Sequence, residues 1–142
     1  MIKESKGQIA LEYLLIFTIS LLLLIVFTLP LAELTIEDTF DVSDSLKLKS
    51  DLSKIGNGIE TVYGEGQGSK QTVYIESTKD ITINVGSNSI YSNLKLKDNS
   101  NKNIKITYDS NLAKSSFSLK KGSNTIIIEW PVNSKNMKIY KI

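Results

Sequence analysis

The stretch YLLIFTISLLLLIVFTLPLA, from Tyr13 to Ala32, decides how the rest of the chain is interpreted. It contains no charge, and its polar members are Thr18, Ser20 and Thr28, whose hydroxyls can bond back to helix carbonyls. A helix rises about 1.5 Å per residue, so the stretch covers about 30 Å, the thickness of a bilayer core. Because a chain of 142 residues is too small to surround such a helix on every side, we expect the stretch to lie in a membrane.

The charges on the two sides of the apolar run differ in sign. Lys3 and Lys6 precede it, whereas acidic residues follow it and no basic residue appears before Lys47. The positive-inside bias therefore places the N-terminus in the cytoplasm and everything after the run outside. An ordinary cleaved secretory signal is the competing interpretation. Such a signal has a shorter apolar region, and here Pro30 stands where its cleavage site needs a small residue.

The residues just before the run form a more specific pattern, Lys6-Gly7-Gln8-Ile9-Ala10-Leu11-Glu12. A short charged leader ends at Gly7, and the lone carboxylate of Glu12 stands at the start of the hydrophobic stretch. Over roughly residues 5–30 the chain resembles the archaeal type IV pilins with class III (prepilin-type) signal peptides. The resemblance implies that a prepilin peptidase cuts between Gly7 and Gln8. It also implies that the apolar helix stays on the mature protein and drives its assembly.

Glu12 follows Gln8 by one helical turn and lies on the same face of the helix. Cleavage before Gln8 frees an α-amine that is largely protonated at neutral pH, and a carboxylate at membrane depth needs a partner. The resemblance implies that this partner is the N-terminal amine of a neighbouring subunit, which sets the axial register. Gln8 and Glu12 are thus the predicted assembly residues. The alternative is that Glu12 reaches the membrane interface as an ordinary flanking residue.

Pro30 interrupts the helical pattern near the end of the run. Proline removes one backbone hydrogen bond and clashes with the preceding turn, so a kink is expected there. The same residue is equally compatible with the end of the membrane span. The resemblance to type IV pilins favours a kink in a helix that continues.

Downstream of Pro30 the sequence predicts an amphipathic helix. Its apolar stripe has helical spacing and is expected to pack on the chain's own domain. The stripe consists of Leu48, Leu52, Ile55, Ile59 and Val62. Gly56 and Gly58 each weaken a helix, which favours an end near residue 56, and the stretch from Gly64 to Ser69 stops it.

These features divide the chain into four parts. The expected parts are a leader at 1–7, a helix at 8–63, a Gly-rich linker at 64–70 and a β-rich head at 71–142. Within the helix, 13–32 forms the transmembrane or filament-core part and 33–63 the amphipathic part.

From Gln71 onward apolar residues alternate with polar ones, which indicates about seven short strands separated by Gly-, Asn- and Ser-rich turns. The expected strands lie around 73–75, 81–85, 90–96, 104–108, 117–119, 126–130 and 137–139. Asp98-Asn99-Ser100-Asn101 lacks the glycine and terminal glutamate of a calcium loop and is expected to be a hairpin turn. The predicted fold class is α+β, a long hydrophobic N-terminal helix followed by a small antiparallel β-sandwich or barrel.

Composition excludes several kinds of chemistry. The chain has no Cys, His or Arg, which excludes Cys/His metal sites, disulfides, a catalytic Cys and a Ser–His–Asp triad. We therefore expect no cofactor, no metal and no enzymatic activity. The lack of Arg argues against specific recognition of nucleic acid.

Charge is unevenly distributed. Residues 33–94 carry 5 Lys and 10 acidic residues, a net charge of −5, and residues 95–142 carry 10 Lys and 3 acidic residues, a net charge of +7. This pattern is either a solvated surface or a contact with other subunits or with anionic surfaces.

The predicted function is a structural subunit of an archaeal type IV pilus-like surface filament with an adhesion role. Its expected partners are identical or homologous pilin subunits, the prepilin peptidase, and the membrane before assembly. Its C-terminal domain would be extracellular throughout. The alternatives are a monomeric membrane-anchored binding or adhesion module and a pseudopilin.

Overall fold

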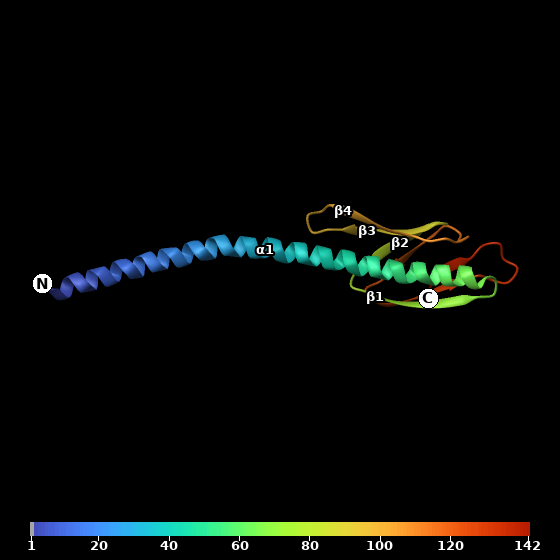
Figure 1. Cartoon of the computed structure of the whole chain (residues 1–142), viewed down its shortest axis with the longest axis horizontal. Helices are drawn as coiled ribbons and strands as arrows, with labels where there is room; N and C mark the ends of the chain where they lie inside the picture. Colours follow the sequence, from blue (N-terminus) through green and yellow to red (C-terminus); the bar gives the residue numbers. More distant parts are fainter. Residues whose placement is uncertain (1) are drawn as a thin grey trace. The chain divides into compact units, whose positions relative to one another are not determined.

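The structure is a computed structural model that describes the backbone of residues 2–142 and the side chains of residues 7–33, 35, 36 and 38–142. One helix, α1 (Ile2–Glu65), is followed by strands only. The strands are β1 (Lys70–Ser77), β2 (Ile81–Val85), β3 (Ser89–Lys95), β4 (Asn101–Thr107), β5 (Ser115–Leu119), β6 (Gly122–Glu129) and β7 (Lys138–Lys141). The prediction of an α+β fold with a long N-terminal helix is confirmed (Figure 1).

The chain divides into two units, and the boundary falls inside α1. The first unit ends at Phe40 and consists of helix alone, and the second comprises Asp41–Ile142 with the rest of α1 and all the strands. The second unit is called the head below.

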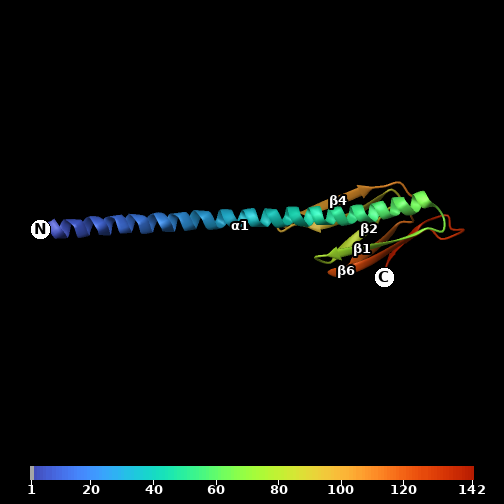
Figure 2. The same cartoon turned by 60° about the horizontal axis from the view of Figure 1, so that its bottom comes forward.

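The head contains two antiparallel sheets. One has the strand order β1-β6-β7, and the other has the order β4-β3-β2-β5. In the described part of the chain neither sheet closes on itself, so the predicted barrel is not formed. In both views the head's part of α1 lies between the β4 hairpin and β1 (Figures 1 and 2).

The predicted apolar stripe of α1 lies in the core that both sheets share. Its side chains are at most 2% exposed and join one apolar cluster with residues of both sheets. Gly58 lets the helix come close to its neighbours, whereas Gly56 stands at an ordinary contact distance. A Cβ on Gly58 would stand 2.9 Å from Ile128 Cδ1 and 3.0 Å from Val73 Cγ2, and a Cβ on Gly56 would stand 3.4 Å from Ile106 Cγ2.

The helix does not end near Gly56, as helix propensity suggested, but runs to Glu65. Tertiary packing explains the difference. The two glycines cost helix propensity, but they stand where the helix contacts the sheets, and burial of the stripe outweighs that cost.

A compact turn reverses the chain after α1. Gly66 has a φ of 87°, and its N–H donates to the Val62 carbonyl at 3.0 Å, which caps the last turn of the helix. Gly68 has a φ of 92°, its N–H donates to the Trp130 carbonyl, and the Trp130 N–H donates to the Ser69 carbonyl. This is a β-bulge with glycine at its left-handed position, and it starts the pairing of β1 with β6.

A serine on the buried face of β3 is satisfied by a hydrogen bond. Ser92 is fully buried between Ile90 and Leu94. Its Oγ donates to the Thr82 carbonyl of β2 at 2.7 Å, which satisfies the buried hydroxyl.

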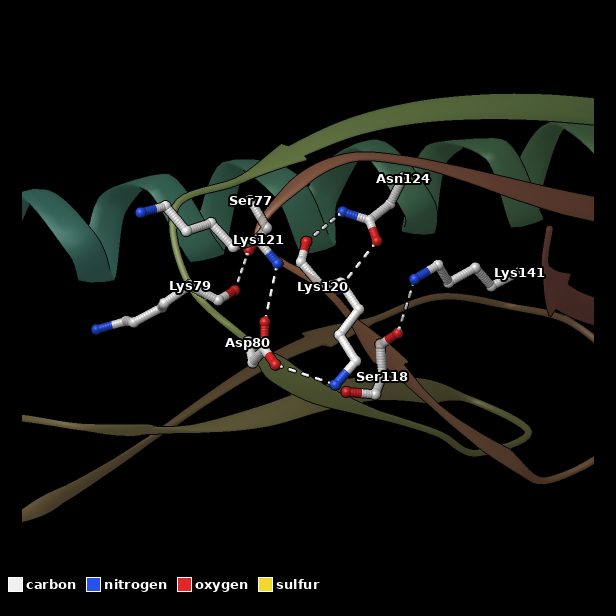
Figure 3. A network of polar contacts seen from close by, with 8 residues as sticks. All are labelled: Ser77, Lys79, Asp80, Ser118, Lys120, Lys121, Asn124 and Lys141. Atoms are coloured by element: carbon white, nitrogen blue, oxygen red, sulfur yellow. Dashed lines mark hydrogen bonds and ion pairs between the residues drawn. The ribbon is translucent and has the colours of Figure 1, made fainter.

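A polar network ties the two sheets together where the chain crosses between them (Figure 3). Asp80, just before β2, accepts hydrogen bonds from the Lys121 N–H at 2.9 Å and from Lys120 Nζ at 3.0 Å. The Asn124 side chain brackets Lys120 with two further bonds to its backbone. The Lys121 N–H, followed by Lys120, holds the pKa of Asp80 below its ordinary value.

Candidate assembly and interaction surfaces

Among the side chains that the structure describes, those in the apolar half of α1 are not covered by any other part of their unit. Every described side chain from residue 7 to 33 is exposed, and large apolar side chains such as Leu11, Phe17 and Leu24 are each at least 65% exposed. In the described part of the chain, α1 is the one helix long and apolar enough to cross a membrane, judged by length and composition. Such a surface requires lipid or other apolar helices around it.

The predicted cleavage and register residues lie on this part of α1. No described atom stands within 4 Å of where a Cβ on Gly7 would be, so this position is open. Gln8 and Glu12 are both exposed and one turn apart. Glu12 is the only charged residue from 8 to 32 in the sequence, so its carboxylate stands alone in an apolar segment.

The hydroxyl groups of this part of α1 are satisfied by the helix itself. Thr18 Oγ1 donates to the Leu14 carbonyl at 2.8 Å, and Thr35 Oγ1 donates to the Leu31 carbonyl at 2.9 Å. A threonine bonded in this way enters an apolar environment at little cost, because its polar group already has a partner.

Pro30 lies inside α1, which continues on both sides of it. Proline has no N–H, so the Val26 carbonyl loses its usual partner four residues on. α1 continues past Pro30, so the kink and the end of the membrane span at this residue both stay predictions.

Two acidic residues that follow the apolar run hold the helix to its own head. Asp41 Oδ2 accepts a hydrogen bond from the Lys97 N–H at 3.1 Å, and Asp44 Oδ2 pairs with Lys79 Nζ at 2.7 Å. These partners lie in the loops after β3 and before β2. The sequence showed the acidic residues three positions apart but gave no signal for partners so distant along the chain.

A third carboxylate is buried on the same helix. The side chain of Asp51 is 6% exposed, and both of its oxygens lie 3.0 Å from Lys47 Nζ. Because this ion pair is local to the helix, it satisfies the charge without any contribution from the strands.

Lysines surround a pocket between α1 and β4. The pocket has a volume of about 360 Å³, and Lys49, Lys102 and Lys105 contribute to its lining together with Ser45 and Ile104. The Ser45 Oγ is buried and has no hydrogen-bond partner among the described residues. Two lysines from residues 95–142 here meet one from the helix, and a cluster of this kind attracts anionic groups.

The turn at Asp98 behaves as a hairpin. Its carboxylate accepts a hydrogen bond from the Ser100 N–H at 2.8 Å, and Asn99 adopts a positive φ of 65°. The Ser100 hydroxyl, followed by the Ser100 N–H, holds the pKa of Asp98 below its ordinary value. Among the described residues, no group of three or more Asp and Glu side chains is placed to hold a metal ion.

Comparison with known proteins supports the N-terminal pattern. Residues 5–31 match the family model "Class III signal peptide", a span that includes Gly7, Gln8, Glu12 and Pro30. No curated protein and no solved structure matches the chain. A class III signal peptide implies processing by a prepilin peptidase, anchoring in the membrane before assembly, and assembly with other pilin subunits. This match indicates a precursor that resembles those of type IV pilins and pseudopilins.

Proposed function

We propose that the protein is a structural subunit of an archaeal type IV pilus-like surface filament and not an enzyme. The observation that carries the proposal is the apolar half of α1, whose described side chains are exposed and which lies largely within the class III signal peptide match at residues 5–31. Lipid surrounds this helix before assembly. After cleavage between Gly7 and Gln8, helices of neighbouring subunits replace the lipid and form the filament core, with the heads outside.

Glu12 sets the register of that core by pairing with the amine of Gln8 on a neighbouring subunit. Support comes from its isolation, because the sequence offers no other charge from 8 to 32. An amine or a carboxylate left unpaired in an apolar bundle is strongly unfavourable, so only registers that bring the two together are stable.

The experiment compares filaments from cells that produce Glu12→Gln, Glu12→Asp and Glu33→Gln variants of the full chain. Removal of the charge by Glu12→Gln is expected to lower filament yield by on the order of tenfold or more. Glu12→Asp retains part of the yield. Glu33 lies beyond the apolar run, and its variant should assemble normally.

The N-terminal residue of each variant is determined in parallel, so that a processing defect is not mistaken for an assembly defect. Normal filament yield from correctly processed Glu12→Gln protein would refute the register role. A chain that is found only as membrane-bound monomers favours a membrane-anchored binding module. Its recovery with secretion machinery and not in filaments favours a pseudopilin.

We further propose that the head contributes to adhesion on anionic surfaces. The lysine-lined pocket between α1 and β4 supports this proposal, because Lys49, Lys102 and Lys105 bring three positive charges to one place. Filaments with Lys102→Glu and Lys105→Glu together should bind negatively charged beads less than wild type, most clearly at low salt.

The matched control is the pair Lys114→Glu and Lys135→Glu, which changes the net charge equally at exposed lysines outside the pocket. Equal loss of binding in both double variants would show that overall charge and not the pocket governs adhesion. Binding that does not respond to salt would remove the electrostatic basis altogether.

A further inference from the structure

The two sheets have four outer strands, and β1 differs from the others. β5 has five residues and β7 has four, which makes them short edges. β4 presents Lys102 and Lys105 and contains no acidic residue that could pair with them on a second copy, so these lysines discourage pairing with another chain. β1 is eight residues long, contains no proline, and exposes Tyr74 by 73%. It is therefore the edge best suited to pair with a further strand.

The bulge after α1 fixes which backbone groups of β1 point outward. The Trp130 N–H donates to the Ser69 carbonyl, so the backbone carbonyl of Ser69 points toward β6. The N–H and C=O of successive residues in a strand point alternately to its two sides, so the backbone groups of the odd-numbered residues from Gln71 to Ser77 also point toward β6. The even-numbered residues turn their N–H and C=O away from β6. These are Lys70, Thr72, Tyr74 and Glu76.

The outward edge is accessible. All four outward residues have exposed side chains. Among the described residues, no hydrogen bond joins their backbone groups to another element, and neither Lys70 nor Glu76 has an ion pair.

The charges along this edge are complementary to themselves. When β1 is placed antiparallel to a second copy with Val73 opposite Val73, Lys70 stands opposite Glu76 at both ends and Thr72 stands opposite Tyr74. All four outward residues then form hydrogen-bonded pairs, each of which exchanges two backbone bonds. A shift by two residues in either direction leaves outward residues unpaired and separates Lys70 from Glu76.

We propose that the head associates with a second copy of this chain by antiparallel pairing of the two β1 edges in this register. The contact is isologous, and it extends the β1-β6-β7 sheet across both copies. Cross-strand ion pairs between Lys70 and Glu76 select the register, and the backbone ladder provides most of the attachment.

The pairing has a consequence for orientation. Within the head, β1 runs back along α1 after the turn at Gly66 (Figures 1 and 2). Two copies related by this contact therefore direct their head segments of α1 oppositely. Subunits within one filament share one direction, so, resting on the proposed function, the contact joins two filaments that run in opposite directions.

The test uses cysteine cross-linking, which the absence of native cysteine makes unambiguous. Full-length Thr72→Cys and Tyr74→Cys proteins are purified in detergent, mixed, and exposed to mild oxidant. Directly opposed residues lie about 5.5 Å apart between Cα atoms, within disulfide range. The mixture should therefore form a disulfide dimer. When one variant is oxidised alone, the cysteines of its two copies stand diagonally across the contact, beyond that range. Each variant alone should therefore form at least about tenfold less disulfide dimer than the mixture.

A second set of variants tests the register. Lys70→Glu in the cysteine background opposes like charges and should reduce the yield of the mixed dimer by about tenfold, and Lys70→Glu with Glu76→Lys should restore it. A further variant combines Thr72→Pro with Tyr74→Cys in one chain. The proline removes an outward N–H but none of the hydrogen bonds between β1 and β6, and it should also abolish the mixed dimer. Tryptophan fluorescence melts confirm that each variant is folded.

A mixed dimer no more abundant than either single-cysteine product would overturn the proposal, as would failure of the charge exchange to restore it. Neither result bears on filament assembly, because the measurement is made on unassembled protein and does not involve Glu12.

Discussion

A Cβ on Gly58 would stand within 3.0 Å of side chains of β1 and β6, whereas a Cβ on Gly64 of the same helix would have nothing within 4 Å. From the sequence alone both residues count as weak points of the helix. The difference between them depends on Ile128 and Val73, which are far along the chain, so no local pattern contains it. For the same reason the sequence suggested an early end to α1, although it correctly identified the buried stripe around these glycines.

Alanine substitution at the two glycines should have opposite effects. Gly58→Ala is expected to lower the free energy of unfolding by about 1–3 kcal/mol, because its Cβ overlaps Val73 and Ile128. Gly64→Ala is expected to raise it by up to about 1 kcal/mol through helix propensity. Denaturant unfolding of the full chain in detergent, followed by the fluorescence of Trp130, measures both. A stabilised Gly58→Ala protein would contradict the close packing described for this position.

At the scale of the element, α1 serves two environments with one continuous helix. Its first part exposes apolar side chains on all sides, and its later part buries one stripe against two sheets. Both properties follow from residue order, an uninterrupted apolar run and then a helical period, so both were predictable. The contacts of Asp41 and Asp44 with the loops of the head were not, because their partners depend on how the strands fold back.

Leucine truncation separates the two environments. Leu52→Ala should lower the free energy of unfolding of the head by about 2–5 kcal/mol, because this side chain is fully buried. Leu22→Ala, at a side chain 56% exposed, should leave the unfolding of the head unchanged. The same Trp130 fluorescence assay reports on the head alone. Equal destabilisation by both substitutions would mean that the apolar half of α1 supports the folding of the head.

For the whole molecule, the alternation of apolar and polar residues predicted seven strands and an antiparallel head, but it could not predict the order of the strands in the sheets. Which strands pair depends on crossings such as the one from β5 to β6, where the chain leaves one sheet for the other. Asp80, Lys120 and Asn124 hold that crossing together, and nothing in their local sequence marks them as partners.

Removal of Asp80 should weaken this connection in a pH-dependent way. The pKa of Asp80 is lower in the folded protein than in the unfolded chain. The stability that its charge provides is therefore fully present when the pH lies above the pKa in the unfolded chain, and it is lost as the pH falls through the pKa in the folded protein. Asp80→Asn should therefore lower the denaturant midpoint at neutral pH, and the difference from wild type should disappear in acid. Asp109→Asn is the control, since in the described part of the chain its carboxylate has no hydrogen bond. A difference that persists unchanged at low pH would contradict the electrostatic origin.

We propose that the chain is cut after Gly7 and that its apolar helix then forms the core of a filament. N-terminal sequencing of material sheared from the cell surface, with electron microscopy of the same sample, tests both steps at once. We expect filaments whose subunit begins at Gln8 and retains the apolar run from Tyr13 to Ala32. Protein that begins at Met1, found in membranes and absent from any filament, would contradict the proposal.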